Sequence, residues 1–482
     1  MEANVTEMWL IVESLQRELT FKLDSMGTDM DTLWLMVGSI LVIFMQAGFA
    51  LLEVSCVGAA HTKNMLVKNL LDLAVAAVMW WSFGWGIAYG GEGGGCALNP
   101  FAGHESFFSR GEEFQDEQGG YSTAEGYNWA FFLFQQLSFS GTTVTIVSGA
   151  VGARITMTGY VIFSHVMGGF IYPVVVRWGW SALGWASAWS DTRDDLLFGC
   201  GVIDFAGSGV IHATGGMAAL VMVVLMGPRL GRFTEGGSKK MDEHSVILQT
   251  LGAFILWVGW YGFNGCSTGY ITGSSHMAAK AMVVTTISAA AAGLGVTSAS
   301  LVLFQHVGPD EVVNGLLSGL VAITAGCAVV EVEAAFFIGL VAATIYLAAS
   351  RFLVSVHVDD MVDAAPVHLA NGAWGIIAAG LFASKEGYSS SYYSDRELCC
   401  GWLYGCGPAQ LMANASFLLA ILSWASISTF LVVYILKLSG TLRISRASER
   451  EGTDSIAHDG LELSKFTKNI LSRVAALVSA VG

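Results

Sequence analysis

The stretch GVIDFAGSGVIHATGGMAALVMVVLMGPRLGRF, residues 201–233, decides the fold of this chain. Residues 203–226 are apolar and long enough to cross a bilayer, and a basic loop follows them. Yet the stretch carries an acid, Asp204, near one end and an imidazole, His212, inside it. An ionisable side chain within a span is costly, so it usually lines a cavity or a path. The stretch therefore predicts a membrane span that contributes a polar group to an internal site.

The composition is that of a polytopic membrane protein. Of 482 residues, 54% are hydrophobic and 13% are charged, against roughly 25% charged in soluble domains. The chain has 58 glycines and only 6 prolines, which fits helices packed closely through small residues. The net charge is −15, but the acidic excess lies in connecting stretches, so a nucleic-acid partner is not expected.

Eleven apolar segments are long enough to cross the lipid bilayer, which predicts an all-α polytopic fold. They lie near residues 33–53, 69–90, 128–151, 157–177, 203–226, 244–264, 277–304, 311–330, 334–354, 365–384 and 411–437. Because eleven is an odd number, the two termini are expected on opposite sides of the membrane.

Lys and Arg in the connecting segments predict the direction of insertion. With the C-terminus inside, the inner segments hold fifteen of them and the outer segments seven, while Lys280 lies within a span. This bias predicts that the N-terminus lies outside and the C-terminus in the cytosol. We therefore divide the chain into an extracellular segment 1–30, a membrane domain 31–438 and a cytosolic tail 439–482. The apolar spacing at the end of the tail predicts a short helix at the membrane surface.

The fifth and tenth spans share a pattern. In each, an aspartate precedes a histidine by eight residues, and a glycine follows the histidine by four. The residues are Asp204, His212 and Gly216 in one span, and Asp360, His368 and Gly372 in the other. The two spans lie five apart, and a repeat of five helices must insert upside down. The pattern predicts two inverted five-helix repeats plus a final helix, with a site between the halves near the midplane.

The matched histidines are interpreted as a pair that meets near the pseudo-twofold axis. One alternative is that each histidine only hydrogen-bonds a neighbouring helix. Another is a metal site, which needs further ligands that are not evident beside the pair, so no metal is expected. An enzyme is the least favoured interpretation, because no nucleophile, base and orienting group are seen together.

Several motifs resemble those of the family of ammonium transporters, methylammonium permeases and Rhesus proteins, over nearly all of residues 31–460. They are GFALLEVSCVGAAHTKN (48–64), FSGTTVTIVSGAVGAR (139–154), IYPVVVRWGWS (171–181), GVIDFAGSGVIHATGG (201–216), GPRLGRF (227–233), LGAFILWVGWYGFNGCST (251–268) and VDDMVDAAPVHLANGAWGIIAAGLFA (358–383). The resemblance implies a homotrimer in the plasma membrane, with one narrow pore per subunit. It implies ammonium or ammonia as substrate, with methylammonium as a further candidate, and no cofactor.

The resemblance also assigns roles to particular residues. They are the twin pore histidines His212 and His368, the stacked phenyl gate Phe139 and Phe263, the ammonium recruitment residues Trp180 and Ser267, and the site-organising residues Asp204 and Trp260. Trp180 and Ser267 favour the ammonium transporter branch. From its position at the start of a helix, Asp204 is expected to cap free amides rather than to transfer a proton.

These residue types suit selection of ammonium over potassium. An apolar pore excludes bare cations, because a charge placed in low dielectric costs tens of kcal/mol by idealised Born reasoning. A tryptophan face attracts the cation and a hydroxyl accepts one of its N–H bonds. Once deprotonated, ammonia passes as a neutral molecule, and a histidine pair can exchange the proton. Potassium has no proton to lose.

Some positions depart from the family pattern. Gln135 stands where an aromatic residue is expected in the third span, with Phe134 one residue early, which leaves one wall of the recruitment site in question. The usual Ala-Glu-Arg is Gly152–Ala153–Arg154, without the glutamate. In the tail, Ile456 falls where related plant-type proteins have a phosphorylatable threonine. These departures keep open a rival function, a non-conducting or weakly conducting ammonium sensor that signals through the tail. A second rival is an electroneutral gas channel of the Rhesus type.

Five cysteines are predicted near the outer face, where disulfides are chemically accessible. They are Cys96, Cys200, Cys399, Cys400 and Cys406. Their pairing does not follow from the sequence.

Overall fold

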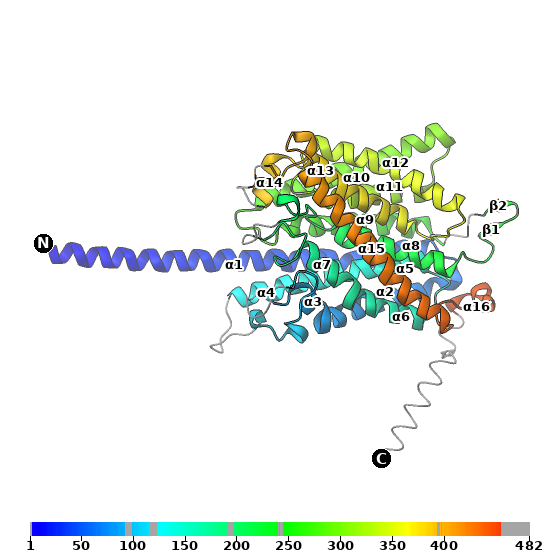
Figure 1. Cartoon of the computed structure of the whole chain (residues 1–482), viewed down its shortest axis with the longest axis horizontal. Coiled ribbons are helices and arrows are strands. Elements are labelled where there is room, and N and C mark those ends of the chain that lie inside the picture. The colour runs from blue at the N-terminus through cyan, green and yellow to red at the C-terminus, as the bar shows by residue number, and fades with distance from the viewer. Residues whose placement is uncertain are drawn as a thin grey trace, which may run out of the picture.

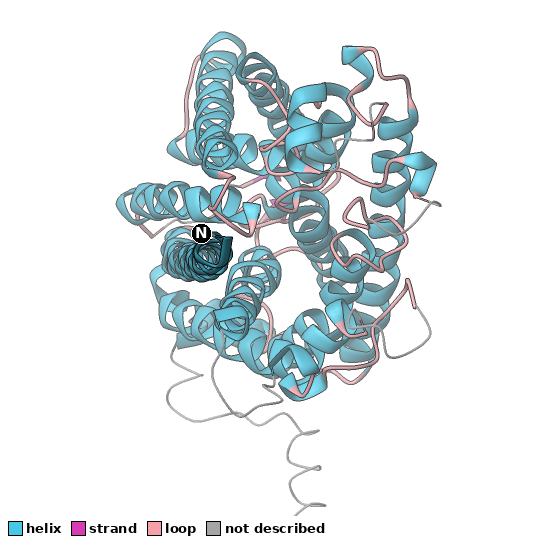
Figure 2. Cartoon of the chain, turned by 90° about the vertical axis from the view of Figure 1, so that its left-hand side faces the viewer, coloured by secondary structure: helices cyan, strands magenta, loops and turns pink. Residues whose placement is uncertain are grey.

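A computed structural model describes residues 2–91, 99–114, 123–190, 196–239, 241, 244–392, 396 and 398–454. The chain is a bundle of helices from which the N-terminal half of α1 (Glu2–Ser55) projects (Figure 1). Seen end-on, the helices surround the core as a closed group, and the loops gather between their ends (Figure 2).

The predicted eleven-span fold is confirmed. Within the described residues, nine helical stretches are long and apolar enough to cross a membrane. Two further spans complete the count: α11 (Pro309–Ile323), which is shorter, and an interrupted helix between residues 123 and 151. The chain is therefore an all-α polytopic membrane protein.

The first half has five spans: α1 supplies the first, and the four that follow are each assembled from consecutive helical pieces. The pieces are α2 (Thr62–Met79), η2 (Trp80–Gly84) and α3 (Trp85–Tyr89); α4 (Thr123–Leu133), η5 (Phe134–Ser140) and α5 (Gly141–Val151); α6 (Met157–Val166), η6 (Met167–Ile171) and α7 (Tyr172–Gly179); and η8 (Ser208–Ala213) with α8 (Thr214–Met226).

The second half has the same plan, with a final helix added. Its spans are α9 (Val246–Trp260), η9 (Tyr261–Gly265) and η10 (Cys266–Thr268); α10 (Ser275–Phe304); α11; α12 (Val332–Ser355); η11 (Ala365–Ala370) with α13 (Asn371–Phe382); and the last helix α15 (Ala409–Leu438).

Short elements join the spans. They are η1 (Ala59–His61), η3 (Phe107–Ser109), η4 (Glu112–Phe114), η7 (Leu197–Gly199), α14 (Lys385–Ser391), η12 (Trp402–Tyr404), α16 (Arg446–Glu451) and an antiparallel pair, β1 (Phe233–Thr234) and β2 (Gly237–Ser238), with Phe233 opposite Ser238.

The inverted repeat predicted from the fifth and tenth spans is seen in their caps. The Asp204 carboxylate accepts a hydrogen bond from the amide five residues later, at Gly209, over 3.0 Å. The Asp360 carboxylate does the same at Ala365 over 2.7 Å. Packing is reciprocal too, because α8 contacts η11 while α13 contacts η8.

The glycines that follow the histidines allow this crossing. A Cβ on Gly216 would collide with the backbone nitrogen of Leu369, and one on Gly372 would collide with the backbone of Ala213. Leu369 and Ala213 each directly follow one of the two histidines. The matched glycines therefore bring the histidine-bearing turns of the two halves into contact.

Wide helical turns interrupt several spans. Within the described part of the chain, six spans contain a π-helical turn. Four of the predicted site residues, Phe139, His212, Phe263 and His368, lie in such turns. A π-turn inserts one residue into the helix and re-aims the side chains around it, and such turns are frequent at functional sites.

Both ends of the described chain are joined closely to the membrane domain. No helix break separates residues 1–30 from the first span, since α1 continues without interruption to Ser55. At the other end, the Asp454 carboxylate accepts hydrogen bonds from the first free amides of α2, at Lys63 and Asn64. The predicted tail helix and Ile456 lie outside the described residues.

Among the described residues, two disulfides lie in the connecting loops. Cys200 is joined to Cys399, and Cys400 to Cys406. Cys96 lies outside the described residues.

Candidate functional site

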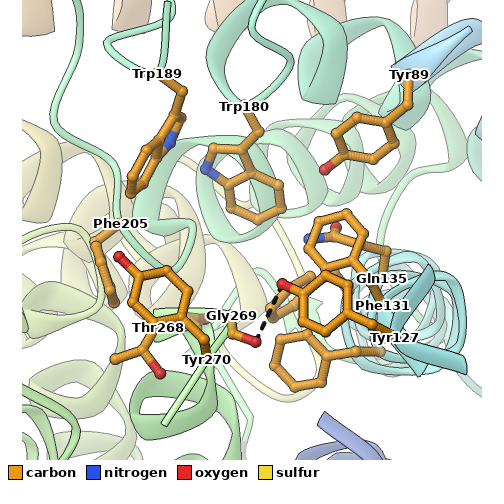
Figure 3. Close-up of a pocket in the computed structure, with 13 residues that line it drawn as sticks. Tyr89, Tyr127, Phe131, Gln135, Trp180, Trp189, Phe205, Thr268, Gly269 and Tyr270 are labelled. Carbon is orange, nitrogen blue, oxygen red and sulfur yellow. Dashed lines mark hydrogen bonds between the residues drawn. The ribbon is translucent and has the colours of Figure 1, made fainter. Parts of the chain in front are cut away.

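The predicted recruitment residues Trp180 and Ser267 line one cavity of about 240 Å³, here called the Trp180 cavity (Figure 3). Aromatic side chains from several spans form most of its wall. The lining residues are Tyr89, Tyr127, Phe131, Phe134, Gln135, Phe139, Trp180, Trp189, Phe205, Ser267, Thr268, Gly269 and Tyr270.

Hydrogen bonds orient Trp180 and Ser267. Trp180 directly follows α7, and its indole nitrogen donates to the backbone oxygen of Asp204 over 2.7 Å. This bond fixes the indole, so one face of the ring is held in the cavity wall. The Ser267 hydroxyl donates to the backbone oxygen of Phe263 over 2.7 Å. Because its only proton is used there, the Ser267 oxygen can offer lone pairs to a donor in the cavity.

Phe139 lines the Trp180 cavity, and Phe263 packs against it without lining the cavity. Both are almost fully buried, and their ring centroids are 4.9 Å apart. The rings were expected to stack, but their planes meet at 80°, so the contact is edge to face. This geometry is favoured because the positive edge of one ring faces the negative face of the other. The Phe139 ring also lies 5.1 Å from the Trp180 ring.

His212 and His368 meet in the interior, at the interface of the two halves. Their Nδ1 atoms are 3.2 Å apart, and the rings are nearly parallel with centroids 5.2 Å apart. Two Nδ1 atoms at this distance share one proton, so one ring donates while the other accepts. His212 is fully buried and its Nε2 has no hydrogen-bond partner among the described residues.

The two residues expected to organise the site hold its framework. The Asp204 carboxylate accepts from the amides of Gly209 and Val210 at the start of η8, and it does not line the Trp180 cavity. The Trp260 ring stacks on His212 at 5.3 Å, and its indole nitrogen donates to Thr324. Trp260 thus supports the imidazole from the side.

Gln135 and Phe134 both line the Trp180 cavity. They open the seven-residue π-helical stretch η5, and the extra residue of a π-turn accounts for an aromatic one position early. The Phe134 ring contacts Phe139 at 5.0 Å. The carbonyl oxygen of the Gln135 side chain is buried and has no hydrogen-bond partner among the described residues. The wall left in question by the sequence therefore carries an aromatic ring and an unused acceptor.

Two further cavities lie on the other side of the histidine pair. The Glu53 cavity, of about 20 Å³, is lined by His368 and Glu53 among others. The Asp363 cavity, of about 370 Å³, is lined by Asp360 and Asp363 with other polar residues. Asn314 and Val362 line both cavities, so the two adjoin.

The sequence did not single out Glu53, Tyr127 or Gln135 as members of a site. A signal for Glu53 was present, because it is a lone carboxylate at the end of a predicted span. Tyr127 lies close to the predicted start of the third span, where nothing distinguishes it from the aromatic belt of a membrane protein. Gln135 was noted only as a missing aromatic residue.

An inverted repeat with polar groups at the interface of its halves defines a membrane transporter or channel. The chain belongs to the ammonium transporter family, which it matches over residues 33–462. The predicted family is thereby confirmed, and it places the chain among transport proteins of the membrane rather than among enzymes.

Individual relatives support the same family assignment. The chain is 35% identical to Ammonium transporter 1 member 3 of Solanum lycopersicum over 449 residues, which covers 90% of this chain and 93% of that protein. It is similar to the crystal structure of Candida albicans Mep2, with 26% identity, a TM-score of 0.74 and 87% of each chain covered. It is also similar to a structure named Sensor Amt Protein, with 26% identity, a TM-score of 0.79, and coverage of 91% of this chain and 100% of that one.

Proposed function

We propose that this protein recruits ammonium in the Trp180 cavity, removes its proton and passes ammonia along the histidine pair. One observation carries the proposal: a continuous column of rings leads from the Trp180 cavity to the histidines. Successive centroids are 5.1 Å apart from Trp180 to Phe139, 4.9 Å to Phe263, 5.6 Å to His212 and 5.2 Å to His368. Family membership supports ammonium or ammonia as the substrate.

Three groups in the Trp180 cavity suit a small cation with N–H bonds. The Trp180 ring offers a π face, which is worth about 0.5–2 kcal/mol to a cation. Ser267 offers lone pairs, because its proton is already used. Gln135 offers an unpaired carbonyl oxygen. Together they can replace part of the water shell of ammonium without presenting a full negative charge.

The column below the cavity excludes ions. Phe139 and Phe263 are buried and in contact, so a bare cation there would meet only hydrocarbon. The cost of charge in such surroundings is far larger than for neutral ammonia. Ammonium therefore passes only after losing its proton, whereas potassium is rejected.

The histidine pair provides the acceptor for that proton. The short contact between their Nδ1 atoms allows a proton held by one ring to be exchanged with the other. If the proton follows the ammonia, transport carries one net charge. A Rhesus-type gas channel would move ammonia without current, and voltage clamp of oocytes that express the chain distinguishes the two.

The first test is growth of yeast that lacks its own ammonium permeases on low ammonium. We expect growth with the native chain and loss of growth with His212→Ala, His368→Ala and the double variant. His165→Ala is the matched control, because His165 lies in a span but is exposed and bonded only to its own helix. Surface levels are compared with a tag. Full growth of the double variant would refute the twin-histidine pore.

A second candidate function is an ammonium sensor that conducts little. It is favoured by the likeness to the structure named Sensor Amt Protein and by the docking of Asp454 on α2, which couples the tail to the membrane domain. No growth despite normal surface levels, with ammonium binding to the purified protein that is lost in Trp180→Leu, would favour the sensor.

We further propose that the chain forms a homotrimer in the plasma membrane. The Trp180 cavity and N-terminus would lie outside and the Asp363 cavity and tail in the cytosol. The family resemblance supports the trimer, and the Lys and Arg bias supports the orientation. Light scattering of the purified protein tests the first, and accessibility of tags at both termini in intact cells tests the second.

A further inference from the structure

Glu53 is a buried carboxylate with one oxygen unused. Its side chain is 2% exposed, and Oε2 accepts hydrogen bonds from Asn69 over 2.8 Å and from Ser148 over 2.9 Å. Oε1 is equally buried and has no partner among the described residues. Leaving such an acceptor unpaired in a low-dielectric interior is costly, so it calls for an explanation.

The unused oxygen belongs to a side chain that lines the same cavity as His368. The Phe49 ring lies 6.4 Å from the His368 ring, and Glu53 follows Phe49 on α1 by one helical turn. The cavity of about 20 Å³ is large enough for one water molecule, and Glu53, His368, Asn314 and Thr145 supply it with polar neighbours. His368 uses Nδ1 to contact His212, so its Nε2 is the nitrogen available on this side.

The Glu53 cavity also adjoins the Asp363 cavity. Asn314 and Val362 separate it from the larger Asp363 cavity and line both. Asp363 accepts hydrogen bonds there from Tyr346 and Ser350. A proton released by Glu53 thus has an acidic, polar cavity next to it.

Charged and titratable groups surround Glu53 on its other sides. Lys68 and Asp72 on α2 are buried and lie close enough to interact electrostatically with Glu53, and Asp72 accepts a hydrogen bond from the Tyr160 hydroxyl of α6. The Lys68 ammonium lies 5.4 Å from the Tyr160 ring. Neither Lys68 nor Asp72 lines the Glu53 cavity, so Glu53 is the carboxylate of this cluster that reaches the pore.

We propose that Glu53 is the proton acceptor for His368 and carries the proton from the histidine pair to the Asp363 cavity. The inference rests on the proposed function. The N–H bond at Nε2 of protonated His368 breaks, the proton crosses the single water, and an O–H bond forms at Glu53 Oε1. That bond then breaks as ammonia in the Asp363 cavity takes the proton and becomes ammonium. The carboxylate and the neutral imidazole are restored, and one positive charge has moved.

The test uses the full chain in liposomes, with the current after an ammonium jump and the internal pH recorded together. Glu53→Gln keeps the shape and can still bond Asn69 or Ser148. We expect its current to fall about tenfold or more, since general acid–base groups contribute at least that much. Ammonia would then enter without its proton, so the liposome interior should become alkaline above the rate in protein-free liposomes.

Two variants separate a proton relay from a structural role. Asp72→Asn removes a buried carboxylate from the same cluster without touching the cavity, and we expect it to keep its current. Glu53→Asp keeps a carboxylate and should retain more current than Glu53→Gln. Equal currents in Glu53→Gln and the native protein would overturn the relay, as would joint loss of current and ammonia entry in Glu53→Gln and Asp72→Asn.

The native protein alone distinguishes failure of the relay from failure of the proposed function. Ammonia entry without current would overturn the relay and leave transport standing. No entry of any kind by the native protein would refute the proposed function itself, and the relay with it.

Discussion

Asp204 and Asp360 occupy matched positions on opposite sides of the histidine pair, and their surroundings differ. Asp204 is 2% exposed beneath a cavity walled by aromatic rings. Asp360 is half-buried and itself lines the Asp363 cavity, which is polar. The loops near Asp204 are tied by the disulfide between Cys200 and Cys399, whereas ion pairs tie the loops near Asp360.

The comparison shows which structural features the inverted repeat determines and which can differ between its two halves. The repeat determines backbone placement: each aspartate caps the amide five residues on, and each cap positions a turn that carries a histidine. The side chains beyond the caps are free to differ. One end presents π faces and neutral acceptors suited to holding a cation, and the other presents carboxylates suited to accepting a proton. This division is what a pathway with a preferred recruitment side requires.

The largest effect is expected when the capping carboxylates are removed. In Asp204→Ala the amides of Gly209 and Val210 lose their acceptor in a fully buried place, at about 1–3 kcal/mol each. Asp360→Ala releases one amide, that of Ala365, which is also buried, so about 1–3 kcal/mol is expected in total. Thermal unfolding in detergent, followed by tryptophan fluorescence, should show a larger drop for Asp204→Ala, because two amides lose their acceptor there. Equal drops would mean that the two ends are energetically alike.

The second prediction concerns the ion pairs of the polar end. Asp359 accepts hydrogen bonds from the Arg229 guanidinium and amide at 2.8 Å, and Arg154 lies 3.5 Å away. Burial alone would raise the pKa of Asp359, but the hydrogen bonds and charge of Arg229, with the charge of Arg154, outweigh it and lower the pKa to about 2. Relative to an unfolded pKa near 4, this is worth about 2 kcal/mol.

Because the pKa of Asp359 is lowered, its contribution is fully present above about pH 4 and is lost as pH falls toward 2. Unfolding temperatures measured between pH 7 and pH 3 should therefore decline, and Asp359→Asn should be less stable at pH 7 but decline less. If Asp359→Asn lost stability in parallel with the native protein across this range, Asp359 would be excluded as the source of the pH dependence.

The third prediction weakens the aromatic end. Trp180→Leu removes the π face, worth about 0.5–2 kcal/mol, so the KM for ammonium should rise about 2- to 30-fold. The maximal rate should change less, because the Phe139 and Phe263 gate and the histidines remain. Concentration-dependent uptake measures both. Trp178→Leu is the control, because Trp178 bonds Phe101 and does not line the cavity. An unchanged KM in Trp180→Leu would remove Trp180 from the binding site.

The fold and the column of rings were largely predictable from sequence, and the polar details were not. Hydropathy gave the spans, and the Asp–His–Gly spacing gave the repeat, because both depend on local periodicity. The edge-to-face contact of Phe139 and Phe263 and the place of Phe134 depend on π-turns, which shift the register by one residue without a marked change in composition. The Glu53 cavity depends on four helices that are distant in sequence, α1, α5, α11 and η11, so no local pattern contains it.

The smallest expected effect concerns Gln135, where the aromatic end departs from the family pattern. If its unpaired oxygen accepts an N–H bond from ammonium, Gln135→Leu removes about 1 kcal/mol and should raise the KM about fivefold. Gln135→Phe would restore a ring at this wall and should recover part of the affinity through its π face. The KM of Gln135→Leu relative to the native chain measures the acceptor, and the ratio of the two variant KM values measures the ring, since both variants lack the amide. If Gln135→Leu binds ammonium as well as the native chain, aromatic faces and Ser267 suffice, and the contrast between the two ends of the pore is sharper still.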